Sequence, residues 1–170
     1  MKQKRFTHPR LLRKERQSTP TIPADGDELF QNGVFRIHIS AMLNWMTVNP
    51  QPIVRAPVKA WTISHDMEEC FVVGADITKP IVVAEIAPDF CDFSPVIPRD
   101  DWISRGYVCI DGNHRIEQAR RKGLEVLPAV ALRMEQFIPF MCDGYDRYVE
   151  YWNRKLEERV RDAQLMARNK

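Results

Sequence analysis

The sequence, 170 residues long, predicts a mixed α/β (α+β) fold with a small mixed sheet and a long C-terminal helix. Short apolar runs rich in β-branched residues, typical of buried strands, occur at residues 81–86, 107–110 and 126–132. Segments with helical spacing separate these runs, and a few strands alternating with helices favour a small mixed sheet. From residue 143 onward apolar residues recur every three or four positions, which predicts one long amphipathic helix.

Charge divides the chain into a basic beginning and an acidic middle. Residues 1–20 carry a net charge of +6, residues 21–142 carry −5 and residues 143–170 carry +1. We therefore predict a basic arm and linker over residues 1–27, a folded domain over residues 28–142, and the amphipathic helix over residues 143–170.

The basic arm has two interpretations. A positively charged segment suits DNA or another polyanion. The alternative is a solubilising tail, or a segment that docks on the acidic domain of its own chain. The side chains that would contact a nucleic acid are Lys4, Arg5, Arg10, Arg13, Lys14 and Arg16.

The composition argues against a membrane protein and against a zinc protein. No segment approaches the apolar length that spans a bilayer, and the basic N-terminus lacks the apolar centre of a secretory signal. We therefore expect a cytoplasmic protein with no membrane partner. The cysteines form no C-x-x-C pair, so we expect no metal site and reduced, mostly buried thiols. They are Cys70, Cys91, Cys109 and Cys142.

The first half of the domain should hold one strand and two short helices. Residues 34–39 alternate apolar and polar side chains, which predicts a half-exposed strand with His38 on the surface. Ser40 is the expected N-cap of the first helix. Residues 49–57 contain three prolines and predict a loop or an edge strand. Ser64 would cap the second helix, which has acidic residues in its first turn.

The second half holds the clearest strands. Residues 87–106 predict an irregular connection after the strand at residues 81–86, and the strand at residues 126–132 has a proline near its start. The apolar stripe of the last helix should pack against the domain, although a homodimer seam is an alternative. The stripe consists of Tyr145, Val149, Trp152, Leu156, Val160, Ala163 and Ala167.

A tight turn between the strand at residues 107–111 and the next helix is the candidate functional element. Gly112 permits backbone angles that other residues resist, and Asn113 is a good helix cap. A helix that starts directly after such a turn directs free N–H groups and a positive dipole end at one point, which suits a phosphate. His114 and Arg115 could add side-chain donors to the same anion.

The motifs around this turn resemble those of the ParB/sulfiredoxin-like superfamily. The sequence has T-K-P-I-V-V at residues 78–83, D-G-N-H-R at residues 111–115, and K-G-L-E-V-L-P-A-V at residues 122–130. The resemblance covers roughly residues 34–134. It implies a compact α/β fold that holds nucleotide phosphates at the junction of turn and helix, with ATP, ADP or CTP as ligand and Mg²⁺ as a candidate companion.

The branches of this superfamily differ at the turn. Sulfiredoxins need a cysteine directly before the histidine, where this chain has Asn113, so their activity is not expected. Partition ParB proteins have G-E-R-R at the turn and continue into a helix-turn-helix region, which the single helix after residue 143 does not provide. The turn also resembles the D-G-N-G-R end of the Fic motif, but the start of that motif is missing. Free-serine kinases have D-G-x-H-R, the closest match, which implies a phosphotransferase with a carboxylate base.

The residues of the turn allow structural as well as functional roles. Arg115 would bind the anion or pair with Asp111. Gly112 would either let the backbone approach the anion closely or only form a tight turn. Asp111 could be a base, bind a metal or brace the turn, and His114 could donate to a phosphate or act as acid or base. Asp76 and Glu85 are weaker candidates for a second carboxylate.

Three functions remain open from the sequence. The first is a ParB-like domain that binds a nucleotide or phosphate at Gly112, Asn113, His114 and Arg115, with association with DNA through the basic arm as an open alternative. The second is a phosphotransferase or nuclease-like enzyme with Asp111 and His114 as catalytic residues. The third is a non-catalytic interaction module that acts through its C-terminal helix.

Overall fold

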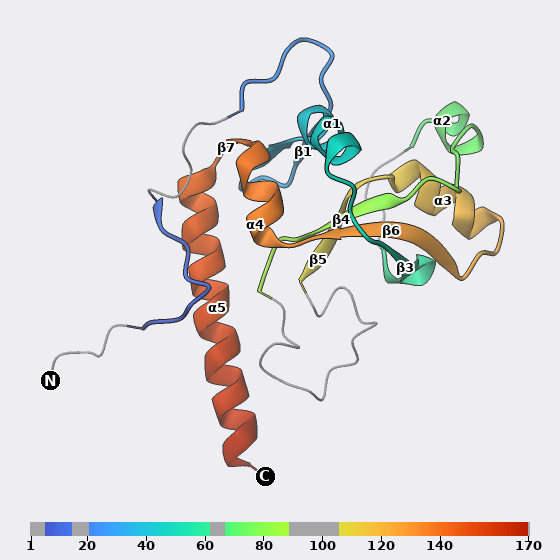
Figure 1. Cartoon of the computed structure of the whole chain (residues 1–170). Helices are drawn as coiled ribbons and strands as arrows, with labels where there is room; N and C mark the ends of the chain where they lie inside the picture. Colours follow the sequence, from blue (N-terminus) through green and yellow to red (C-terminus); the bar gives the residue numbers. More distant parts are fainter. Residues whose placement is uncertain (1–5, 15–20, 62–66, 89–105, 170) are drawn as a thin grey trace, which may run out of the picture.

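Two small sheets form the centre of the molecule, and the computed structural model describes residues 6–14, 21–61, 67–88 and 106–169 (Figure 1). One sheet has the order β1–β2–β7, and the other has the order β3–β6–β4–β5. In the second sheet β4 and β6 are parallel, whereas β3 and β5 run antiparallel to their neighbours, so the predicted mixed sheet is confirmed. The strands are β1 (Leu29–Gln31), β2 (Arg36–His38), β3 (Ile53–Pro57), β4 (Ile81–Glu85), β5 (Tyr107–Asp111), β6 (Val126–Leu132) and β7 (Met141–Asp143).

Helices cover both faces of the four-stranded sheet. The helices are α1 (Ile39–Val48), α2 (Glu69–Val73), α3 (Asn113–Arg121), α4 (Met134–Phe137) and α5 (Tyr145–Arg168), with 3₁₀ turns η2 (Val58–Ala60) and η4 (Ile138–Phe140). Figure 1 shows α2 and α3 at one end of the sheet and α5 along the opposite side of the molecule. The α/β content and the long C-terminal helix agree with the predicted fold class.

Alternate residues of β4 enter two separate hydrophobic cores, as the period of a strand requires. Ile81 and Val83 pack with Ile116 of α3 in the smaller core. Val82 and Ala84 join the larger core, which contains much of the three-stranded sheet and Trp152 of α5. Because β4 is buried on both faces, its sequence is a continuous apolar run and does not alternate with polar residues.

The start of α1 differs from the prediction. The helix begins at Ile39 and its N-cap is His38, so Ser40 lies in the first turn, where its Oγ accepts a 2.8 Å hydrogen bond from the Glu28 N–H. The prediction of a surface His38 is also wrong. This side chain is buried, and its Nε2 lies 2.8 Å from Asp27 Oδ2. The chain before β1 folds back over β2, which strand periodicity alone does not reveal.

The short elements around the four-stranded sheet bear on four further predictions. Residues 49–57 contain the edge strand β3, which agrees with the loop-or-edge alternative. α2 begins at Glu69, and Ser64, the predicted cap, lies outside the described residues. β6 is an inner strand, but its pairing with β4 begins only at Ala129. The preceding proline is therefore tolerated near the start of the strand. Most of the predicted 87–106 connection also lies outside the described residues.

The packing of α5 follows the predicted stripe over its first half. Tyr145, Val149, Trp152 and Leu156 are buried, and Tyr148, which the stripe did not include, is fully buried beside them. Exposure increases further along the helix, and the last turn is exposed. Among the described residues, no helix combines the length and apolar character needed to cross a membrane.

Candidate functional site

The turn between β5 and α3 depends on the backbone of Gly112. This residue has a φ of 105°, in the left-handed region that favours glycine, and it is the N-cap of α3. Asn113, which we predicted as the cap, is instead the first helical residue, because Gly112 completes the turn one position earlier. A glycine cap supplies no side-chain hydrogen bond, so the first N–H groups of α3 are left without one from this position.

The absence of a side chain at Gly112 also makes room for its neighbours. A Cβ atom there would lie 2.7 Å from Ile81 Cγ2 and 2.8 Å from Arg115 Nη2. It would lie 2.9 Å from Arg115 Nε. The guanidinium of Arg115 therefore lies directly over the turn, in space that any other residue would fill.

Arg115 forms the ion pair that the sequence allowed as its structural role. Its Nη2 donates a 2.7 Å hydrogen bond to Asp111 Oδ2, and the two side chains are 19% and 15% exposed. Its buried Nε, however, has no hydrogen-bond partner in the described part of the chain. Leaving a buried donor unsatisfied costs about 1–3 kcal/mol. Arg115 thus braces the turn and also keeps one donor for which the described residues supply no acceptor.

The turn lies in the wall of a cleft of about 1020 Å³. Asp111, Gly112, Asn113, His114 and Arg115 all line it, so the predicted site residues share one concave surface. Their proximity follows from their adjacency in sequence. Residues from distant segments also line the cleft, among them Glu28, Phe71 and Lys79, together with the candidate carboxylate Asp76.

Carboxylates outnumber fixed cations among the described residues that line the cleft. Glu28, Asp76 and Asp111 line it together with Lys79 and Arg115. Partial desolvation, followed by the nearby Asp111 carboxylate, raises the pKa of Glu28 above its ordinary value, although Arg115 and His114 oppose this shift. Hydrogen bonds from the Thr78 hydroxyl and N–H lower the pKa of Asp76. The cleft therefore holds one carboxyl group whose pKa is raised and one whose pKa is lowered.

Cys109 also lines the cleft but is not suited to be a nucleophile. It is buried, and its Sγ donates to the Asp111 carbonyl oxygen at 3.2 Å. Burial raises the pKa of this thiol to about 12, so it stays protonated at neutral pH. Among the other described cysteines, Cys70 is exposed, which corrects the expectation of mostly buried thiols in that case.

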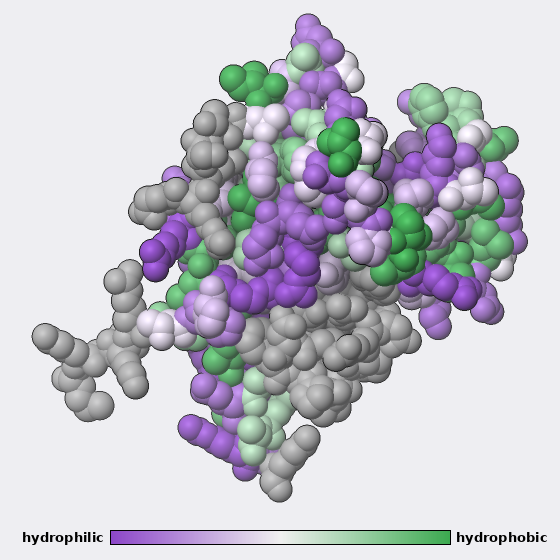
Figure 2. Space-filling view, in the orientation of Figure 1, coloured by the Kyte–Doolittle hydropathy of each residue, from purple (hydrophilic) through white to green (hydrophobic). Residues whose placement is uncertain are grey.

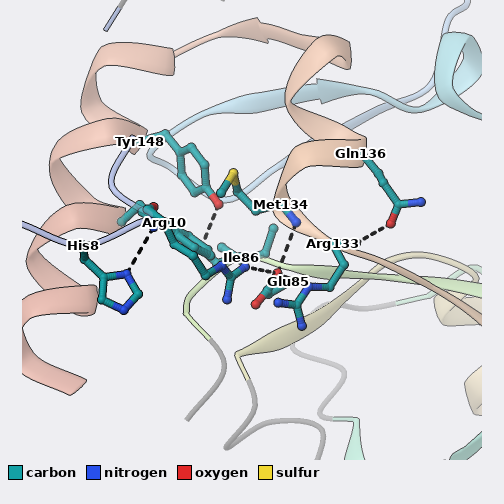
Figure 3. A network of polar contacts seen from close by, with 9 residues as sticks. His8, Arg10, Glu85, Ile86, Arg133, Met134, Gln136 and Tyr148 are labelled. Atoms are coloured by element: carbon teal, nitrogen blue, oxygen red, sulfur yellow. Dashed lines mark hydrogen bonds and ion pairs between the residues drawn. The ribbon is translucent and has the colours of Figure 1, made fainter. Parts of the chain in front are cut away.

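Glu85, the other weak carboxylate candidate, belongs to a separate polar network and does not line the cleft (Figure 3). It is fully buried at the end of β4. Its Oε2 accepts hydrogen bonds from Arg10 Nη2 at 2.7 Å and from the Met134 N–H at 3.2 Å, and it pairs with Arg133 Nε at 3.2 Å. These donors compensate the buried charge, so the role of Glu85 is structural.

Part of the basic arm docks on α5. Leu12 is buried, and its backbone N–H and carbonyl bond the two side-chain atoms of Asn153 at 2.8 and 2.9 Å. Trp152 Nε1 donates to the Arg10 carbonyl at 2.9 Å, and Lys14 pairs with exposed Glu150 at 3.1 Å. Residues 6–14 therefore dock on their own chain, chiefly on α5, and reach the acidic domain through the Arg10–Glu85 pair, while Arg13 is exposed. The remaining arm cations Lys4, Arg5 and Arg16 lie outside the described residues.

Comparison with known proteins identifies no similar protein. The chain matches no family model, no curated protein and no solved structure. Within the described residues, no three or more His, Cys, Asp or Glu side chains are grouped so that they could hold a metal ion. The resemblance to the ParB/sulfiredoxin-like superfamily thus depends on the sequence motifs alone.

Proposed function

We propose that this protein binds a phosphate group, most suitably that of a nucleotide, at the turn from Gly112 to Arg115. The observation that carries the proposal is the unsatisfied, buried Nε donor of Arg115 beside a glycine-capped helix start. A guanidinium presents several donors to phosphate oxygens, and the N-terminus of a helix adds N–H groups and a favourable dipole. The D-G-N-H-R resemblance supports the same ligand class.

The charges of the cleft favour a nucleotide that arrives with Mg²⁺. Its three carboxylates would repel a bare polyphosphate more than Lys79 and Arg115 attract it. A magnesium ion bridging the phosphates would offset this repulsion, because Mg²⁺ is commonly held by substrate phosphates with only one or two protein carboxylates. We therefore expect binding of ATP, ADP or CTP to be stronger when Mg²⁺ is present.

Replacing Arg115 with alanine should weaken nucleotide binding by roughly 10- to 150-fold, because a hydrogen bond to a charged group contributes about 1.5–3 kcal/mol. Calorimetric titration with ATP, ADP and CTP, with and without Mg²⁺, measures this loss. Lys122→Ala is the control, since Lys122 is an exposed cation at the far end of the same helix and does not line the cleft. Failure of the wild type to bind any nucleotide, or equal affinity of the Arg115→Ala variant, would contradict the proposal.

A phosphotransferase is the second candidate function, and Glu28 is the observation that favours it. A general base works best when its pKa lies near the operating pH, and the pKa of Glu28 is shifted upward. Asp111 forms an ion pair with Arg115, so its carboxylate is better suited to stabilising the turn than to accepting a proton from a substrate. His114 packs its ring against Phe71, with 5.7 Å between the centroids. Glu28 is thus a better candidate base than the two residues that the sequence suggested.

For this second function, Glu28→Gln should abolish phosphoryl transfer to a hydroxyl acceptor such as free serine while nucleotide binding persists. Phosphorus NMR of ATP with the acceptor measures transfer. The wild-type rate should fall as the pH drops through the raised pKa of Glu28, because only the carboxylate accepts a proton. Glu68→Gln, an exposed change outside the cleft lining, is the control. Undiminished transfer by Glu28→Gln would exclude Glu28 as the base.

The other proposed partners have less support. A role near DNA would depend on the basic arm, and deletion of the arm is a poor test because Arg10 bonds buried Glu85. Substituting Lys4 and Arg5 tests the charge of the arm while Arg10 stays in place. If the protein binds no nucleotide, two alternatives remain. One is a homodimer through the exposed second half of α5, and the other is an interaction module without catalysis.

A further inference from the structure

An exposed aromatic side chain stands beside the candidate phosphate site. Phe71, on α2, is 57% exposed and lines the same cleft as Gly112 and Arg115. Its ring is tilted by 54° against the ring of His114, with 5.7 Å between the centroids. One part of the phenyl group therefore contacts the first turn of α3, and most of its surface is open to solvent.

Two polar contacts fix α2, and with it Phe71, to α3. Arg121 Nη1 pairs with Glu69 Oε1 at 2.6 Å, and the buried Gln118 side chain donates to the Val73 carbonyl at 3.2 Å. A helix of five residues is too short to be stable alone, so these contacts and the fully buried side chain of Val72 hold it in place. Hydrophobic surface gathers over this end of the molecule, at the upper right of Figure 2. The position of Phe71 relative to the turn is thus set by the fold.

We propose that Phe71 is the platform on which the base of a bound nucleotide stacks. This inference depends on the proposed phosphate site at Gly112–Arg115. A nucleobase offers a flat π-face, and stacking on an aromatic side chain tolerates different bases because each has such a face. A purine covers more of the ring than a pyrimidine, so ATP should bind more tightly than CTP.

The contrast with Val73 shows why the proposal concerns Phe71 and not the whole of α2. Val73 is 62% exposed on the same helix but does not line the cleft. If hydrophobic exposure on α2 served only to contact another protein, both side chains would matter equally. If it serves the cleft, only Phe71 should affect a small ligand.

The test compares ATP, CTP and inorganic tripolyphosphate, each titrated calorimetrically with Mg²⁺. Phe71→Ala should weaken ATP binding by roughly 5- to 150-fold, the range expected for loss of one base–aromatic stack. Tripolyphosphate affinity should not change, because it has no base. Phe71→Tyr should retain the ATP affinity, and Val73→Ala should match the wild type for every ligand.

The other possible results would contradict either the stacking role of Phe71 or the phosphate site itself. Wild-type protein that binds tripolyphosphate as tightly as ATP, or Phe71→Ala that binds ATP normally, would remove the platform and leave the phosphate site intact. Equal loss of ATP and tripolyphosphate in Phe71→Ala would mean that the side chain only positions His114. No binding of either ligand by the wild type would instead overturn the proposed function itself.

Discussion

Replacing Glu85 with alanine is expected to lower the free energy of unfolding by about 3–5 kcal/mol, the cost of removing one partner from a buried ion pair. The carboxylate is fully buried, and it accepts from Arg10, Arg133 and the Met134 N–H. Without it, these donors keep their desolvation cost and lose a shared acceptor. Domain stabilities are typically about 5–15 kcal/mol, so this single change would remove a large fraction of the total.

The same substitution should loosen the docked N-terminal segment. Arg10 is held at one end by Glu85, and its guanidinium carbon lies 5.0 Å from the centre of the Trp152 ring. Urea unfolding followed by circular dichroism measures the stability. Glu150→Ala is the matched control, because its pairing with Lys14 involves two exposed side chains and should contribute little. A Glu85→Ala midpoint and slope equal to those of the wild type would show that the network does not stabilise the fold.

Replacing Gly112 with alanine should both destabilise the protein and abolish phosphate binding. A non-glycine residue in a sparsely populated backbone region costs about 1–3 kcal/mol. The new Cβ would also approach Ile81 Cγ2 and the Arg115 guanidinium to within 3 Å. Relief of that contact must displace Arg115 from the turn, which removes the donor on which the proposed binding depends.

Gly123→Ala separates these two effects at the other end of the same helix. Gly123 has a φ of 70°, and a Cβ there would meet no atom within 4 Å. This variant should show only the backbone cost, with nucleotide affinity unchanged. Urea unfolding and calorimetric titration of both variants measure the difference. If Gly112→Ala binds and unfolds like Gly123→Ala, the close packing at the turn has no functional consequence.

Several elements were predictable because local patterns determine them. β4 and β6 are continuous apolar runs of strand length, and α5 carries a stripe with helical period. The end of α3 is likewise determined by neighbouring residues. The Gly123 and Leu124 N–H groups bond the carbonyls of Arg120 and Ala119, the pattern that a glycine directly after a helix predicts. The Asp111–Arg115 pair was also open to prediction, since residues four apart meet at a helix start.

The cap of α3 shows the limit of local inference. Asn113 and Gly112 are both acceptable cap residues, so composition alone does not choose between them. Gly112 is the cap because it has no side chain, and Arg115 and Ile81 occupy the space where a side chain would lie. Ile81 is distant in sequence, and its position is known only when β4 pairs with β5.

By itself the sequence determined three strands of the main sheet (β4, β5 and β6), the turn at Gly112 and the two helices with clear periodicity, since these depend on neighbouring residues. Only the tertiary structure decided that His38 is buried, that residues 6–14 dock on α5, and that Glu28 and Phe71 join the turn in one cleft. These features join segments far apart in the chain. The free energy that places them comes from burial and pairing between distant side chains, which leave no periodic signal in the sequence.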